Sequence, residues 1–315
     1  MKGKRIVAVL ILVCLFCGIV AASVYAFVWD QQRKDIAFTI KDTLPNGNGQ
    51  SAKVVLLAGQ SNASGCSVTS YLQKNLSSEK FAELKNGYDN LFINYFASGN
   101  NLSDGFVKTS VDQGESGGHF GPEVGLAEKL HALYPDQTVF IIKFAWGGTD
   151  LFSQWLSPSS GETGFLYRNF VRYVKQSMEY LFAKGYDPVI EGVCWMQGES
   201  DSFSVENGIE YETRLKNFIA DLRKDLSSYA SKDGIAFVDA LIADNPVFWV
   251  YCDLVNRSKL AVAASVDNAV VIDTNAQGLR CDEEPTDKPD IPHYDSLSQL
   301  KLGNLFGEEV ARFFD

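Results

Sequence analysis

A serine, a histidine and an aspartate in this chain could together carry out acyl transfer. Ser61 lies in Gly59-Gln60-Ser61-Asn62, where an apolar segment ends and a turn begins, so its hydroxyl would be exposed and able to act as a nucleophile. Such a hydroxyl needs a base near neutral pH, and the imidazole of His293 fits that need. Asp290, three residues before His293, could accept a hydrogen bond from the other ring nitrogen and so fix the tautomer.

The choice of base is narrow, because the chain has only three histidines. His119, in the glycine-rich loop 117–121, is the second candidate and could line a substrate cleft. His131 flanks the apolar stripe of a predicted helix and is expected to be structural.

Three candidate donors could stabilise the oxyanion that forms during acyl transfer. They are the backbone N–H of Ser61, a backbone N–H of Gly147-Gly148 and the side-chain amide of Gln197, each after a predicted strand. Glycine lets the backbone approach a ligand closely, although a plain tight turn would use it as well. For Gln197 the alternative is a buried amide that satisfies loop backbone.

Short apolar segments alternate with amphipathic helices along the rest of the chain, which predicts a mostly parallel sheet with helices on both faces. In such sheets the ligand lies outside the carboxyl ends of the strands, where the polar motifs at 59–62, 146–150 and 197–201 fall. The segments predicted as strands are 53–58, 91–96, 138–145, 189–196, 235–241 and 269–273. Helical stripes begin near Pro122 and run through 170–181, 211–226 and 302–313.

The composition is that of a globular protein, with 315 residues, 46% hydrophobic residues and a net charge of −11. This acidic balance argues against a nucleic-acid partner, since binding to phosphates needs clustered Lys and Arg. The length suits one large α/β domain.

The N-terminus has the features of an export signal or membrane anchor. Basic residues at 2–5 precede the uncharged segment 6–29, which is long enough to span a bilayer. We expect either an uncleaved anchor or a signal removed after Ala26, with the remainder outside the cytoplasm. The predicted organisation is a signal or anchor at 1–34, a linker at 35–50 and a catalytic domain at 51–315.

Four cysteines would then lie where disulfides are permitted, and the sequence does not choose among their three pairings. No CxxC pair with metal-ligand spacing occurs among them, and no metal or cofactor is predicted. They are Cys66, Cys194, Cys252 and Cys281.

Taken together, four motifs resemble the sialate O-acetylesterase and acetylxylan-esterase branch of the SGNH hydrolases, also called carbohydrate esterase family six. The resemblance covers about residues 51–315 and implies a flavodoxin-like, three-layer αβα fold with a sheet of about five strands. The motifs are Leu57-Ala58-Gly59-Gln60-Ser61-Asn62, Lys143-Phe144-Ala145-Trp146-Gly147-Gly148-Thr149, Trp195-Met196-Gln197-Gly198-Glu199-Ser200-Asp201 and Asp290-Ile291-Pro292-His293-Tyr294.

The resemblance also implies a metal-independent serine esterase in which Ser61 is the nucleophile and His293 the base. Either Asp290 or Glu199 would be the acid partner of His293; the local spacing favours Asp290, and Glu199 with Asp201 would then support the loops. The oxyanion donors would be Ser61, Gly147 and Gln197. Residues expected to contact the substrate are Gln60, Asn62, Gly148, Trp155 and His119.

The expected substrate is an acetylated glycan such as a sialic acid or xylan. Three alternatives remain open at this point: a catalytically silent carbohydrate-binding protein on the same fold, a lipid or thioester hydrolase of the wider group, and an acetyltransferase acting on wall or capsule polymers.

Overall fold

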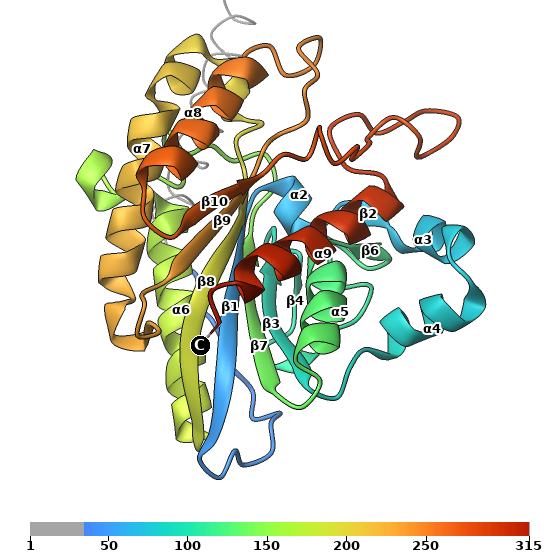
Figure 1. Ribbon diagram of the computed structural model, residues 1–315, viewed down its shortest axis with the longest axis vertical. Coiled ribbons are helices and arrows are strands. Elements are labelled where there is room, and N and C mark those ends of the chain that lie inside the picture. Colours follow the sequence, from blue (N-terminus) through green and yellow to red (C-terminus); the bar gives the residue numbers. More distant parts are fainter. Residues whose placement is uncertain (1–34, 315) are drawn as a thin grey trace, which may run out of the picture. The chain divides into compact units, whose positions relative to one another are not determined.

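A mostly parallel sheet forms the centre of the computed structural model, which describes residues 35–314 (Figure 1). Six strands run parallel in the order β10-β9-β8-β1-β7-β3, and the short β4 and β5 pair antiparallel with β3. The predicted fold class is confirmed, with six parallel strands where about five were expected. The eight strands of the sheet, with β4 and β5 included, are β1 (Gln50–Gly59), β3 (Leu91–Ala97), β4 (Asn101–Leu102), β5 (Val107–Lys108), β7 (Thr138–Ala145), β8 (Tyr186–Met196), β9 (Ala236–Ala240) and β10 (Ala269–Ile272).

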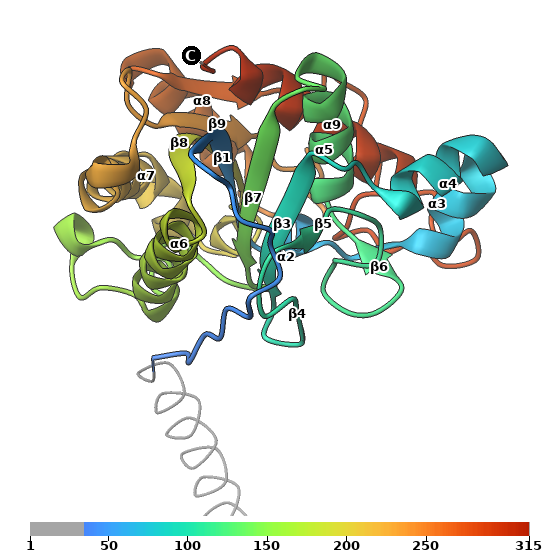
Figure 2. The same cartoon turned by 90° about the horizontal axis from the view of Figure 1, so that it is seen from below.

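Helices cover both faces of this sheet and make the three layers. Helices α5 and α9 pack together on one side, and α6 and α7 lie on the other with α8 beside α7 (Figures 1 and 2). The long helices are α5 (Glu123–Leu133), α6 (Phe165–Ala183), α7 (Val205–Asp225), α8 (Cys252–Ser265) and α9 (Ser296–Ala311). The short elements are α2 (Ser61–Ser64), α3 (Thr69–Asn75), α4 (Ser78–Asn86), the β2 (Ser67–Val68) and β6 (His119–Phe120) pair, and the 3-10 turns η1 (Pro158–Ser160), η2 (Asp201–Phe203) and η3 (Ser227–Tyr229).

The central strands are apolar along their length because both faces of the sheet are covered. All eight residues of β7 are buried, as are the last six of β1. This burial explains why the sequence shows continuous apolar segments there and no alternation.

A few charged side chains lie in this otherwise apolar sheet, and Lys143 is the one that bears on the loops near the site. Lys143 of β7 is fully buried, and its Nζ donates to Glu123 at 2.7 Å and to the carbonyl of Gln113 at 2.9 Å. Burial lowers the pKa of Lys143, and the Glu123 carboxylate offsets part of that effect. Glu123 also accepts the backbone N–H of Gly121 at 2.7 Å. Because a buried ion must be paired, this contact fixes loop 113–121 against the end of β7.

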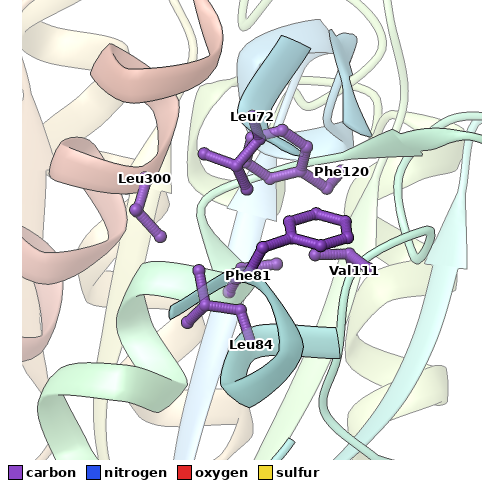
Figure 3. Close-up of a cluster of buried hydrophobic side chains, with 7 residues drawn as sticks. Leu72, Phe81, Leu84, Val111, Phe120 and Leu300 are labelled. Atoms are coloured by element: carbon purple, nitrogen blue, oxygen red, sulfur yellow. The ribbon is translucent and has the colours of Figure 1, made fainter. Parts of the chain in front are cut away.

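A separate apolar cluster holds the small helices near the site (Figure 3). Leu72 of α3 and two residues of α4 pack against side chains from the loop before α5, from α5 itself and from α9. Helix α3 is therefore anchored to the main domain although it has only two turns. The members are Leu72, Phe81, Leu84, Val111, Phe120, Val124 and Leu300.

Residues 38–49, predicted as part of a linker, pack on the domain without regular structure. The Phe38 ring lies 4.8 Å from the ring of Tyr173 and 5.6 Å from that of Phe96, and Leu44 is buried. The compact unit accordingly begins at Phe38.

Two further predictions concern the N-terminus and the cysteines. The segment 6–29 lies outside the described residues, and within 35–314 no helix is both long and apolar enough to cross a membrane. Cys66, Cys194, Cys252 and Cys281 are all free thiols.

Candidate active site

The carboxyl ends of the central strands lie side by side and bring the sequence motifs together. Backbone hydrogen bonds continue the sheet past the strand ends, from Gln60 N to Met196 O at 2.9 Å and from Trp146 N to Gly59 O at 3.0 Å. Gly59 has φ +139°, and a side chain there would collide with the Met196 carbonyl. Glycine at this position lets β1 turn sharply into α2, next to the end of β8.

Ser61 is the first residue of α2, the short helix that follows β1 (Figure 1). Its Oγ has no hydrogen-bond partner among residues 35–314, and the backbone N–H groups of Ser61 and Asn62 meet no acceptor there. The first N–H groups of a helix are left unpaired by the helix itself, so these two can serve a bound group. A Cβ on Gly147 would lie 3.5 Å from the Cβ of Ser61, which places the end of β7 beside the serine.

His293 and Asp290 form a hydrogen-bonded pair in the loop before α9. The distance from His293 Nδ1 to Asp290 Oδ2 is 2.7 Å, and the backbone N–H of His293 also donates to the carbonyl of Asp290 at 2.9 Å. An ionised carboxylate only accepts, so Nδ1 carries the proton and Nε2 is left as the basic nitrogen. Within residues 35–314, Nε2 has no hydrogen-bond partner and no hydrogen bond joins it to Ser61.

The side chain of Asn62 links the serine turn to the histidine loop. Its Nδ2 donates to the carbonyl of Pro292 at 3.2 Å, and its Oδ1 accepts the N–H of Tyr294 at 3.1 Å. These residues stand on either side of His293. The Asn62 carbonyl accepts in turn from Gln299 of α9 at 2.7 Å. The prediction that Asn62 contacts substrate is corrected by this geometry, because its amide is buried and fully engaged.

Of the two acids considered as partners of His293, Asp290 is the one that contacts the ring. Glu199 is buried, and its Oε1 accepts from Asn62 Nδ2 at 2.7 Å. Its Oε2 has no partner among the described residues. Burial raises the pKa of Glu199, while the Asn62 hydrogen bond and the charges of Lys259 and His293 lower it in part.

Gln197 and Gln60 connect loops beneath the site. Gln197 Nε2 donates to Asp201 Oδ2 at 2.6 Å and to the Thr149 carbonyl at 3.0 Å, and its Oε1 accepts from Tyr211 at 2.9 Å. Both amide hydrogens are used, so the expected role of Gln197 as an oxyanion donor is not available in this arrangement.

Gln60, expected to contact substrate, is also a link. It is buried, and its Oε1 accepts the backbone N–H of Gly198 at 3.3 Å and of Ser200 at 3.2 Å. The turn that follows β8 is thereby tied to the turn that follows β1.

The N–H of Gly147, another expected oxyanion donor, points at a hydroxyl. It donates to Ser98 Oγ at 3.0 Å, and Ser98 also pairs with Ser64 at 3.1 Å. Ser98 directly follows β3, so its place at a strand end was visible in the sequence but was overlooked. Gly148 is exposed in the turn and has φ +69°. A Cβ added to it would meet no atom within 4 Å.

Trp155 cannot contact a substrate, which corrects the prediction that it would. Its side chain is fully buried, its Nε1 donates to Thr149 Oγ1 at 2.9 Å, and its ring packs 5.1 Å from that of Trp195. An aromatic residue near a motif could not be distinguished from a core residue by sequence alone.

A cavity of about 320 Å³ opens beside His293, and His119 and Tyr71 lie in its wall. His119 and His293 therefore line the same cavity. Cys66 also lines this cavity, and its thiol donates to Glu115 at 3.0 Å. Burial raises the pKa of Cys66, and the charge of Glu115 adds to the effect. Neither Cys66 nor Glu115 belongs to a motif, which is why sequence reasoning missed both.

Replacing Asn62 tests the link to the histidine loop. Asn62→Ala leaves the Tyr294 N–H, the Pro292 carbonyl and Glu199 without their partner, so we expect the free energy of unfolding to fall by about 2 to 4 kcal/mol. Hydrogen exchange of the Tyr294 amide should become faster. Asn217→Ala, which removes one surface hydrogen bond to Ser160, is the control. Unchanged exchange at Tyr294 would contradict the link.

Replacing Asp201 tests whether burial raises the pKa of its carboxyl group. Burial raises the pKa of Asp201 from 3.8 to about 7. The folded protein therefore holds this proton more tightly than the unfolded chain, and the stabilisation is complete below the unfolded pKa and lost as the pH rises through about 7. Relative to Asp201→Asn, the wild type should lose a few kcal/mol of unfolding free energy between about pH 4 and pH 8, since one pKa unit corresponds to about 1.4 kcal/mol.

Urea titrations of both proteins across this range measure the difference. The exposed Asp233→Asn is the control for loss of one surface charge. A wild-type advantage over Asp201→Asn that does not change with pH would show that Asp201 is ionised throughout.

Comparison with known proteins gives the family. A model of the family described as carbohydrate esterase, sialic acid-specific acetylesterase, matches residues 51–312. No curated protein matches the chain. Among residues 35–314, no group of three or more His, Cys, Asp or Glu is placed to hold a metal ion.

Solved structures with low sequence identity share the fold. A protein from Arabidopsis thaliana is 20% identical with a TM-score of 0.61, over 86% of this chain and 100% of its own. NanS is 16% identical with a TM-score of 0.62, over 86% and 99%. A carbohydrate acetylesterase from Xanthomonas citri, XAC1771, is 16% identical with a TM-score of 0.54, over 82% of this chain and 56% of its own.

The family match spans most of the chain and includes all four motifs and the Asp290–His293 pair. It confirms the resemblance found in the sequence and sets aside the catalytically silent alternative. The chain belongs to the sialic acid-specific acetylesterase family of carbohydrate esterases and is a carboxylic ester hydrolase.

Proposed function

We propose that this protein removes O-acetyl groups from carbohydrates by a Ser61–His293–Asp290 acyl-enzyme mechanism. The observation that carries the proposal is the Asn62 link. The residues before and after His293 are both hydrogen-bonded to the residue that follows Ser61, while His293 Nδ1 is held by Asp290 at 2.7 Å. These links support our assignment of His293 Nε2 as the base for the serine hydroxyl, and catalytic hydrogen bonds commonly tighten only when substrate binds.

In the first step His293 Nε2 takes the proton of Ser61 Oγ, and the oxygen attacks the acetyl carbonyl carbon. The tetrahedral intermediate collapses when Nε2 returns that proton to the sugar oxygen, which leaves as an alcohol. The acetyl group remains on Ser61. Asp290 stabilises the imidazolium throughout without itself taking the proton.

In the second step water attacks the acetyl-serine, and His293 again takes and returns one proton. Acetate leaves and the Ser61 hydroxyl is restored. The Ser61 N–H donates to the oxyanion in both steps. The Gly147 N–H joins it by exchanging its present acceptor, the Ser98 hydroxyl, for the oxyanion.

A glycan substrate is supported by the match to a carbohydrate esterase family. The basic and apolar N-terminal segment 2–29 supports an extracytoplasmic setting, either anchored or secreted, where acetylated glycans occur. The acyl preference is tested with esters of increasing chain length, and the transferase alternative with added sugar acceptors.

The role of Ser61 is tested with Ser61→Ala in the full chain. We expect acetate release from 4-nitrophenyl acetate and from acetylated sialic acid to fall by at least about a thousandfold, since removal of a nucleophile leaves only residual catalysis. Ser265→Ala, on the exposed end of α8, is the matched control and should retain full activity. A Ser61→Ala protein with more than a tenth of wild-type activity would refute the mechanism.

The two candidate acids are separated by amide variants. Asp290→Asn removes the charge that orients and stabilises the His293 imidazolium, so kcat should fall by about one to three orders of magnitude. Glu199→Gln keeps an oxygen for Asn62 and should reduce kcat by less than about threefold. The opposite ranking of kcat values would assign the acid to Glu199.

A further inference from the structure

The lining of the cavity beside His293 indicates which part of the substrate the cavity would hold in the proposed reaction. Its volume is about 320 Å³, and His293 and Asp290 form part of its wall. His293 protonates the departing sugar oxygen, so a cavity on its side of the site is where the alcohol half of the ester would lie. Ser61 itself does not line the cavity.

The acidic groups in this wall are already engaged. Glu284 accepts from Asn75 Nδ2 at 2.8 Å, from the Ser296 N–H at 2.7 Å and from the Ser296 hydroxyl at 2.8 Å. Asp290 is paired with His293. Neither carboxylate is free to bind a sugar hydroxyl without giving up a structural contact.

Three donor groups in the wall are unengaged by contrast. Among residues 35–314, the Lys288 ammonium, the Tyr71 hydroxyl and His119 Nε2 have no hydrogen-bond partner, while His119 Nδ1 pairs with Ser116 at 2.9 Å. Lys74 adds a second positive charge nearby, with its Nζ 4.9 Å from the centre of the Tyr71 ring. The wall contains two carboxylates and one lysine, and its groups without a partner are hydrogen-bond donors, of which the Lys288 ammonium carries a positive charge.

The helix that carries Tyr71 is anchored to the domain. The next residue, Leu72, is fully buried in the apolar cluster of Figure 3, which ties α3 to α9. Val68 and His119, which also line the cavity, are register partners in the β2–β6 pair. A flat aromatic ring held in this way is suited to stacking on a sugar ring.

On the basis of the proposed function, we infer that this cavity binds the sugar half of the ester and that Lys288 selects acetylated sugars carrying a negative charge. Tyr71 contacts the sugar ring and Lys288 pairs with its anionic substituent. Both are specificity-determining residues outside the four motifs.

The test uses two substrates that differ by one charge, the acetylated methyl glycosides of glucuronic acid and of glucose. We expect the wild type to show a lower KM for the glucuronide, and added salt to reduce the preference. Lys288→Met should raise KM for the glucuronide about three- to tenfold and change that for the glucoside less than twofold. Lys288→Arg should retain the preference. Lys232→Met, in the exposed loop that leads into the amino end of β9, is the charge control.

Two outcomes would overturn the inference: a wild type without preference for the glucuronide, or Lys288→Met affecting both sugars equally. Tyr71→Ala is the second variant. It should raise KM for both sugars and leave KM for 4-nitrophenyl acetate unchanged. An equal effect on the KM values of all three substrates would show that the cavity does not bind the sugar. Failure of the proposed function is seen separately, as Ser61→Ala retaining activity on 4-nitrophenyl acetate.

Discussion

The arrangement of this site depends on one amide side chain. Asn62 joins segments more than two hundred residues apart, since it follows the serine and holds the backbone on both sides of the histidine. Its amide can do this because it has both a donor and an acceptor group, which backbone N–H and C=O groups match. Asn62 Nδ2 also donates to Glu199 Oε1 at 2.7 Å, and this third hydrogen bond keeps the amide from rotating.

Most of the unusual polar residues at the strand ends serve this kind of positioning. Gln60 and Gln197 lie between turns, and Lys143 with Glu123 fixes another loop beneath the sheet edge. A loop cannot be buried unless its polar groups are satisfied, and these side chains supply the partners. Ser61 Oγ and Nε2 of His293, which have no hydrogen-bond partner among residues 35–314, are then available for chemistry.

The sequence predicted the sheet well because buried parallel strands are continuous apolar segments; β7 occupies the predicted range 138–145. It also predicted the Asp290–His293 contact, since three-residue spacing needs only local structure. It could not separate a substrate-facing amide from a supporting one, as with Asn62 and Gln197, because residue type does not name a partner. The cavity wall formed by Tyr71 and Lys288 was not predicted, because it depends on how two distant loops meet.

The hydrogen bond from Gln299 to the Asn62 carbonyl bears on how the chain matures during translation. The serine turn precedes the histidine loop and α9 by more than two hundred residues, so it is synthesised well before them. In the proposed mechanism the Ser61 hydroxyl therefore has no base until the histidine loop and α9 have docked on the serine turn. A nascent chain that stops short of α9 should accordingly be inactive as an esterase.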